Sequence, residues 1–254
     1  MNNLNFIEEN PEQKKVLIFL HPLNLSLWIW NKQFKEFNNF NNIFIDLPNH
    51  GKSNKNFNFE ISKTVDILKE FILELNKEEI NFVGIGLGGQ IAIEFISKYP
   101  NLINKVIVSG VQSIDEKSKE SYETSIVQIL NKTKKILDSK SEDFLALAYL
   151  RYYGIGKEYY EYLFKNYLNQ DYENLKRISY ENLNYSLNKK PKDKSKEILV
   201  CFGSYDTIWV KSSVFKIKKI YTNVKPLKIE NATHLWNIRK YKLFNKLLKD
   251  YFKY

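Results

Sequence analysis

Short apolar runs rich in strand-forming residues recur along the chain and alternate with longer stretches of helical periodicity. The runs that predict strands are Val16–Leu20, Asn42–Leu47, Ile80–Gly84, Lys105–Ser109, Ile198–Phe202 and, more weakly, Pro226–Ile229. Uninterrupted apolar runs of this length are typical of strands buried on both faces. The helical patterns are Leu27–Phe37, Ile61–Leu75, Gly88–Lys98 and Asn237–Phe252. This alternation predicts an α/β fold, a mostly parallel sheet with helices on both faces.

One long stretch interrupts the alternation. Between Val111 and Pro191 the sequence is helical in pattern and rich in Tyr and Lys, with no convincing strand. An insertion at the carboxyl end of a strand would lie over the place where open α/β sheets bind ligands. We therefore expect a single domain, residues 1–254, with a helical lid over residues 111–191. The alternative is a helical decoration that touches no ligand.

Composition and charge limit the partners that we expect. The chain has 254 residues, 43% of them hydrophobic, and a net charge of +10. Lysines occur together with acidic residues in helical stretches such as Glu70–Glu79 and Lys240–Lys253. Mixed charge of this kind is typical of solvated faces and predicts no nucleic-acid partner. No apolar run reaches the roughly 18 residues of a membrane span, and Met1–Asn10 does not resemble a signal peptide. We expect a soluble cytoplasmic protein with no membrane partner; the oligomeric state stays open.

A glycine-rich turn follows the third predicted strand. Its sequence is Gly84-Ile85-Gly86-Leu87-Gly88-Gly89, and a helical pattern begins directly after it. A sharp strand-to-helix turn needs small residues on either side of its apex, because the start of the helix passes close to the strand. The glycine spacing does not match a complete dinucleotide fingerprint, and no acidic strand end follows about 20 residues later. The pattern therefore favours a tight turn with its apex at Gly86.

Four further segments, together with this turn, resemble the α/β-hydrolase superfamily, particularly its small lidded esterases and C–C hydrolases. They are His21-Pro22-Leu23, Asp46-Leu47-Pro48-Asn49-His50-Gly51-Lys52-Ser53, Phe202-Gly203-Ser204-Tyr205-Asp206 and Asn231-Ala232-Thr233-His234. Asn49 departs from the family's usual glycine. The resemblance covers nearly the whole chain, and the five segments occur in the family's order at suitable strand ends.

The resemblance implies a role for each residue at these segments. Asp206 and His234 would be the acid and the histidine of a catalytic triad, and the backbone N–H groups of Leu23 and Leu87 would form the oxyanion hole. Gly86 would stand at the nucleophile position, where the family has serine. Because glycine has no side-chain atom that can attack a carbonyl, we expect no ordinary serine-esterase turnover.

The remaining reactive residue types are better explained by structure than by catalysis. His21 and His50 are expected to stabilise loops, Cys201 lies inside a predicted strand, and Ser109 lacks the geometry of the elbow. A single cysteine cannot form an intramolecular disulfide, which agrees with a reducing compartment. No cluster of His, Cys and carboxylates has the spacing of metal ligands. We expect no metal and no cofactor.

Three functional hypotheses remain open. The chain is a ligand-binding or regulatory protein that uses the former pocket, or an enzyme in which His234 and Asp206 act as a general acid–base pair, or an esterase whose serine was replaced by Gly86 to trap a substrate. The ancestral chemistry is ester or acyl hydrolysis in each case. Tyrosines and leucines of the lid suggest a small apolar or aromatic ligand: Leu145, Leu147, Tyr149, Tyr152, Tyr153, Tyr159 and Tyr160.

Overall fold

A seven-stranded sheet forms the centre of the computed structural model, which describes residues 4–53, 58–168 and 171–253. The strands are β1 (Phe6–Glu9), β2 (Lys15–Leu20), β3 (Asn41–Ile45), β4 (Glu79–Ile85), β5 (Lys105–Ser109), β6 (Glu197–Gly203) and β7 (Val224–Ile229). Their spatial order is β1-β3-β2-β4-β5-β6-β7, and every neighbouring pair is parallel except β1 with β3. The α/β fold with a mostly parallel sheet is confirmed.

Helices cover both faces of the sheet, which explains why the strands are apolar throughout. One face packs against α1 (Ile61–Leu75), α2 (Leu87–Lys98) and α7 (Ile208–Ile220). The other packs against the short 3₁₀ helix η1 (Leu27–Trp30), α8 (Trp236–Arg239) and α9 (Tyr241–Phe252). Alternate residues of β2 enter the two cores, with Ile18 in the first and Phe19 in the second. Two further 3₁₀ turns are η2 (Pro100–Leu102) and η3 (Lys157–Tyr159).

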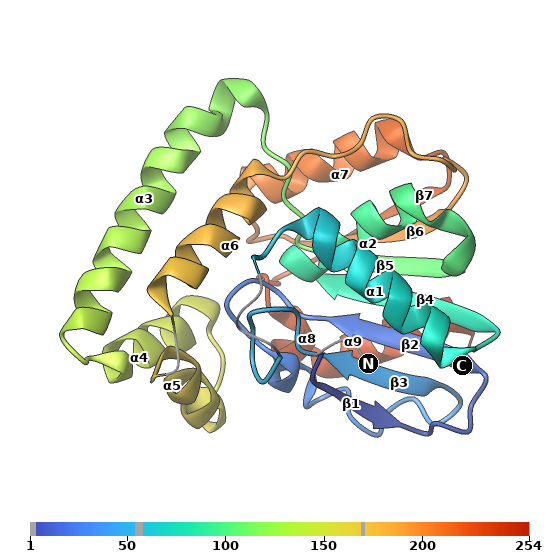
Figure 1. Cartoon of the computed structure of the whole chain (residues 1–254), viewed down its shortest axis with the longest axis horizontal. Coiled ribbons are helices and arrows are strands. Elements are labelled where there is room, and N and C mark those ends of the chain that lie inside the picture. The colour runs from blue at the N-terminus through green and yellow to red at the C-terminus, as the bar shows by residue number, and fades with distance from the viewer. Residues whose placement is uncertain (1–3, 54–57, 169–170, 254) are drawn as a thin grey trace.

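The stretch between β5 and β6 is helical, as predicted. It forms α3 (Glu116–Asp138), α4 (Glu142–Tyr153), α5 (Tyr160–Leu168) and α6 (Tyr172–Asn184). These helices stand at the end of the sheet toward which the parallel strands point (Figure 1). The segment therefore lies at the carboxyl ends of the strands.

Two expectations about local structure were wrong. Leu27–Phe37 is not a regular helix: η1 spans only its first four residues, and Lys35 has a left-handed φ of 62°. Trp28, Ile29 and Trp30 are all buried. Three consecutive buried residues do not fit the single apolar stripe of a surface helix. The predicted helix Asn237–Phe252 is divided near Lys240 into α8 and α9. Strand β1, with the sequence FIEE, was not expected.

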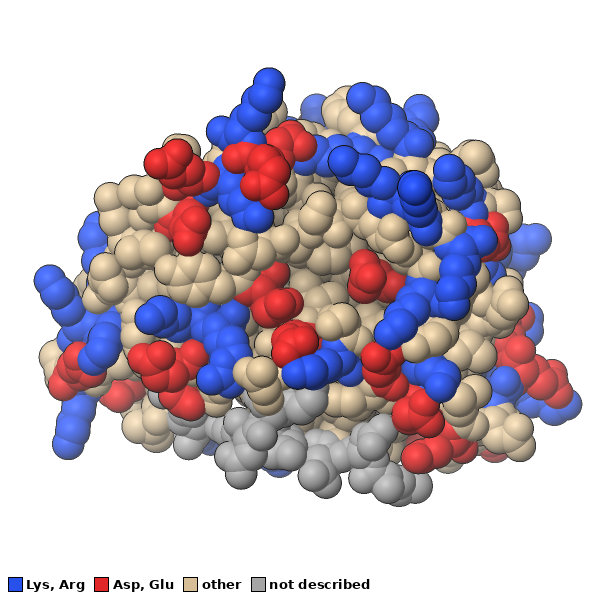
Figure 2. Space-filling model, turned by 45° about the horizontal axis from the view of Figure 1, so that its top comes forward, with Lys and Arg blue, Asp and Glu red and all other residues tan. Residues whose placement is uncertain are grey.

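On the face shown in Figure 2, charged side chains of both signs are scattered among uncharged ones, with some regions richer in Lys and Arg than others. None of the helices in the described part of the chain is both long and apolar enough to span a membrane.

Candidate functional site

The turn from β4 into α2 has the tight geometry that its glycines predict. Gly86 has φ 55° and ψ −116° and stands immediately before α2. A Cβ added at Gly84 would lie 2.6 Å from the carbonyl oxygen of Gly88, and one added at Gly88 would lie 2.1 Å from that of Leu20. Both contacts are shorter than real side chains tolerate, so the glycines on either side of the apex allow the helix to pass close to the strands.

His234 lies directly over this turn. A Cβ added at Gly86 would come 2.8 Å from Nε2 of His234 and 3.1 Å from Cβ of Pro22. The same ring also packs against Gly110, where an added Cβ would lie 2.4 Å from its Cε1 and Nδ1 atoms. The imidazole is therefore seated between two glycines at the ends of β4 and β5, with Nε2 toward the apex.

Asp206 is close to the histidine but is not hydrogen-bonded to it. The distance from Oδ1 of Asp206 to Nδ1 of His234 is 3.8 Å, beyond hydrogen-bond reach. The other carboxylate oxygen, Oδ2, accepts the backbone N–H of Gly203 at 2.7 Å, and the side chain is 4% exposed. The hydrogen bond that joins the acid and the histidine of a triad is thus not formed here, although the two groups face each other at ion-pair distance.

Burial keeps the imidazole neutral. Although 23% of the His234 side chain is exposed, the dense packing around it lowers its pKa, and the carboxylate of Asp206 opposes that shift only partly. The ring of Tyr153, from α4, lies 6.2 Å from the imidazole. Burial also raises the pKa of Tyr153 to about 12. The site is therefore uncharged at His234 near neutral pH and is bounded on one side by an aromatic ring.

The two backbone donors suggested by the sequence flank the apex. Leu87 is the first residue of α2, and Leu23 follows Pro22, the residue that approaches Gly86. Within residues 4–53, 58–168 and 171–253, neither N–H group donates to a protein acceptor. Both groups can thus donate to an oxygen of a bound molecule, as an oxyanion hole requires.

Ser109 and Cys201 do not supply a nucleophile at the apex. Ser109 is 1% exposed, and its Oγ accepts a hydrogen bond of 2.9 Å from Nε1 of Trp236. Cys201 is also buried, and burial raises the pKa of its thiol to about 12. A thiol that stays protonated inside a strand is inert. As expected, neither residue presents a reactive nucleophile to the turn.

The remaining two histidines stabilise loops, as expected. The Nδ1 atom of His21 is 2.8 Å from the carbonyl oxygen of Pro22, and its Nε2 accepts the N–H of Leu47 at 3.0 Å. His50 is placed in the same way, with Nδ1 2.9 Å from the Pro48 oxygen and Nε2 accepting from Asn24. Burial lowers the pKa of His21 to about 4 and that of His50 to about 3. Both rings bridge backbone groups in the neutral form.

Three residues of this site were missed by sequence reasoning: Gly110, Pro22 as a contact of the apex, and Trp236. Gly110 offered a signal, since a glycine follows directly after the buried run Lys105–Ser109 and so marks the end of a strand beside the predicted turn. No sequence signal marked Trp236 as part of the site, because Ser109, its hydrogen-bond partner, is 127 positions away.

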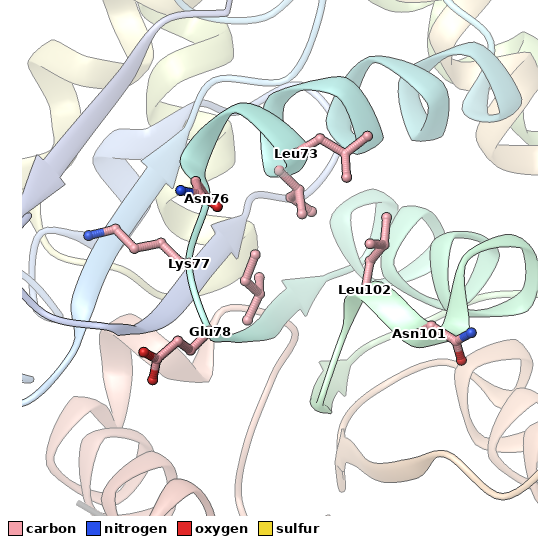
Figure 3. Close-up of a pocket in the computed structure, with 8 residues that line it drawn as sticks. Leu73, Asn76, Lys77, Glu78, Asn101 and Leu102 are labelled. Carbon is pink, nitrogen blue, oxygen red and sulfur yellow. The ribbon is translucent and has the colours of Figure 1, made fainter.

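A hollow of about 200 Å³ lies far from these residues. It is lined by Leu73, Asn76 and Lys77 near the end of α1, by Glu78 just before β4, by Ile80 within β4, and by Leu102 (Figure 3). It therefore opens at the amino ends of the strands, opposite to Gly86. Among the residues that the structure describes, no group of three or more His, Cys, Asp or Glu side chains could hold a metal ion.

The profile of one protein family, described as the alpha/beta hydrolase fold, matches residues 15–241. The chain therefore belongs to the alpha/beta hydrolase fold family. A curated relative is the abhydrolase domain-containing protein abhd-5.2 of Caenorhabditis elegans, 24% identical over 159 residues. The match covers 59% of this chain and 35% of that protein, so this chain spans about a third of the relative's length.

Several solved structures superpose on almost the whole chain. MenH from S. aureus has a TM-score of 0.78 at 18% identity and covers 100% of this chain and 98% of its own. A marine microorganism esterase has a TM-score of 0.76 at 22% identity, covering 98% and 99%. An α/β hydrolase from a deep-sea metagenome library has a TM-score of 0.79 at 18% identity, covering 99% and 94%. At these identities the likeness shows the fold alone.

Proposed function

We propose that this chain is a member of its family without a covalent nucleophile, in which Gly86 stands at the nucleophile position and the site binds a small apolar or aromatic ligand. One observation carries the proposal: a Cβ added at Gly86 would lie 2.8 Å from Nε2 of His234. A side chain at this point would meet the histidine, as a nucleophile must meet its base. The φ of 55° at the apex supports it, since a nucleophile elbow is strained in this way.

The helices between β5 and β6 act as a lid in this proposal. Tyr153 of α4 approaches His234, and the neighbouring Tyr149 ring lies 4.4 Å from that of Tyr153. Burial raises the pKa of both phenols, so they present neutral aromatic surface at physiological pH. A lid with this lining favours apolar or aromatic ligands over charged ones.

A second function is hydrolysis without an acyl-enzyme. A neutral imidazole whose Nε2 faces the apex can remove a proton from a water molecule while the water oxygen attacks a bound ester carbonyl. The N–H groups of Leu23 and Leu87 would hold the developing oxyanion, and the leaving alcohol would take the proton back from His234. Two features favour this function: the burial of His234, which lowers its pKa, and the N–H groups of Leu23 and Leu87, which have no protein acceptor in the described part of the chain.

Labelling with a fluorophosphonate tests the nucleophile position. The wild-type chain should give no adduct by intact mass, because no serine stands at the apex. Gly86→Ser should gain one adduct on residue 86, at a low rate because His234 must first move away from the new Cβ. Gly86→Ala is the matched control, since it adds the same Cβ without the hydroxyl.

Two results would refute the proposal. One is an adduct on the wild-type chain, which would reveal another nucleophile; the other is a folded Gly86→Ser variant that stays unlabelled. Hydrolysis of p-nitrophenyl acetate and butyrate separates the two functions. If wild type equals His234→Ala, the binding function stands, and ligands are sought by thermal shift among acyl and aromatic metabolites. If wild type is faster by more than about tenfold, general-base hydrolysis is the function.

A further inference from the structure

Positive charge is concentrated in one part of the chain. Residues 188–228 contain eleven Lys and three Asp or Glu, so they account for eight of the ten net positive charges. In Figure 2 blue side chains gather toward the upper right, on the side where α7 and the loop before β6 lie in Figure 1. The interleaving of charges that predicts no anionic partner elsewhere therefore does not hold for this region.

The two most basic pieces of this region are joined in space. The N–H and the hydroxyl of Thr222, just after α7, both donate to the carbonyl oxygen of Lys194 at 2.7 and 3.0 Å. This places the loop 188–196 beside the last turn of α7, which carries Lys218 and Lys219. We call the exposed lysines of these two pieces the basic face: Lys189, Lys190, Lys192, Lys194, Lys218 and Lys219.

The charge of the basic face is not neutralised locally. Lys216, Lys225 and Lys228 have acidic partners at 2.8, 3.5 and 2.7 Å. Within the described part of the chain, no acidic group lies at ion-pair distance from any lysine of the basic face. Lys192 instead lies over the ring of Tyr99. Asp193 is the one acidic residue in the loop 188–196, so the face presents a net positive charge to solvent.

Large apolar side chains protrude from the same helix. Phe215 is 69% exposed and Ile208 is 67% exposed. Seven positions separate them, so they share one side of α7, and Phe215 is three and four positions before Lys218 and Lys219. Large apolar side chains that are exposed to water are energetically unfavourable. Apolar side chains surrounded by lysines are complementary to the surface of a lipid bilayer, where anionic head groups lie above an apolar layer.

We propose that α7 and the loop 188–196 form a docking surface for an anionic lipid bilayer, with Phe215 and Ile208 entering the head-group region. Two features favour lipid over nucleic acid. The basic face has no Arg, the residue that pairs bidentately with phosphate and guanine, and Ile208 is aliphatic and cannot stack on bases. The inference is independent of the proposed function and replaces the expectation that the chain has no membrane partner.

Vesicle co-sedimentation of the full chain tests this inference. Wild type should bind vesicles of phosphatidylcholine with about 30% phosphatidylserine, and much less those of phosphatidylcholine alone, with binding that weakens as salt rises. Lys218→Gln/Lys219→Gln should bind roughly 30-fold more weakly, because each lysine near an anionic surface contributes about fivefold. The matched control is Lys132→Gln/Lys135→Gln on the exposed side of α3, which should change binding less than about twofold.

The apolar part is tested separately. Phe215→Ser should weaken binding about tenfold, whereas Phe144→Ser, which removes a side chain 61% exposed on α4, should not. The inference is overturned if wild type does not prefer anionic vesicles, or if the control variants lose as much as the test variants. It is also overturned if Lys218→Gln/Lys219→Gln weakens the binding of an oligonucleotide, measured by fluorescence anisotropy, but leaves vesicle binding unchanged.

Discussion

At the scale of single residues, His234 is held by close packing more than by its acid. Its ring fits between Gly86 and Gly110. The Oδ1 atom of Asp206 stays 3.8 Å from Nδ1 of the ring, and its Oδ2 atom accepts a hydrogen bond from the N–H of Gly203. In a triad the acid fixes the imidazole through a hydrogen bond. Here the two glycines provide much of that constraint, because a side chain at either position would push the ring aside.

Gly110→Ala should therefore destabilise the fold more than a comparable glycine substitution. Gly110 and Gly154 both have left-handed φ values, 65° and 61°, so alanine costs about 1–2 kcal/mol at each. At Gly110 the new Cβ would also lie 2.4 Å from a packed ring, whereas at Gly154 it would meet the flexible end of Arg239 at 3.1 Å. Urea unfolding should show Gly110→Ala to be less stable than Gly154→Ala by a further 1–3 kcal/mol, roughly. Equal losses would mean that the ring moves freely.

The buried histidines predict a loss of stability in mild acid. The pKa of His21 is about 4 and that of His50 about 3, and both are near 6.5 when unfolded. Because the unfolded state binds protons first, stability is present above pH 6.5 and falls below it, by about 1.4 kcal/mol per pH unit for each histidine. His234 adds to this slope, and Glu94, whose pKa is raised by burial, opposes it.

Urea unfolding between pH 7 and pH 5 should measure this slope, above the range where most carboxylates titrate. His50→Gln should lower the slope by about 1.4 kcal/mol per pH unit, since it removes one proton taken up on unfolding. A slope that does not change in this variant would show that His50 is already protonated in the folded chain.

At the scale of elements, α6 is fastened to α2 one turn beyond the apex. Nδ2 of Asn182 donates to Oε1 of Gln90 at 2.7 Å, and Nε2 of Gln90 donates to the carbonyl oxygens of Asn182 and Gln112 at 3.0 and 2.8 Å. Gln90 is fully buried. These hydrogen bonds can all form only when α6 lies in one position relative to α2. Gln90 and Asn182 therefore fix where α6 meets the sheet domain.

Asn182→Ala should loosen this attachment. It leaves Oε1 of Gln90 buried without its donor, which costs about 1–3 kcal/mol. Hydrogen exchange in α6 should become faster in the variant, and the unfolding free energy should fall by that amount. Asn184→Ala, at an exposed position two residues later, should stay within about 0.5 kcal/mol of wild type. If both variants behave alike, the helix is held by its apolar contacts instead.

Helices and strands were predictable from the sequence where their buried positions follow a regular pattern. Lys105–Ser109 and Ile61–Leu75 were predicted with their observed bounds, because a strand buried on both faces and an amphipathic helix each leave a regular pattern. The prediction of a helix over Leu27–Phe37 failed because several large side chains are buried in succession there. The spacing of apolar residues in the sequence does not distinguish such a segment from a helix. Strand β1 failed because it lies at the edge of the sheet and its residues are only partly buried.

At the scale of the whole molecule, the candidate site assembles from strand ends that are far apart in sequence. The order of motifs was enough to predict that Gly86, Asp206 and His234 would meet, because parallel strands present their carboxyl ends at one edge. The distance between Asp206 and His234 was not predictable. It depends on how the loops after β6 and β7 pack, and no local pattern encodes that packing.

The molecule also divides into a well-buried sheet domain and a less buried helical segment, which should differ in local stability. The helix α1 has 15 residues with six buried, whereas α3 has 23 residues and buries only Leu130. Since the packing of an apolar face supplies most helix stability in proteins, α3 should open locally while α1 opens only on global unfolding. Hydrogen exchange should show α3 amides exchanging much faster than those of α1, at rates that low urea hardly changes. Equal protection of the two helices would mean that the segment between β5 and β6 unfolds only together with the sheet, and a lid that opens by itself would then be excluded.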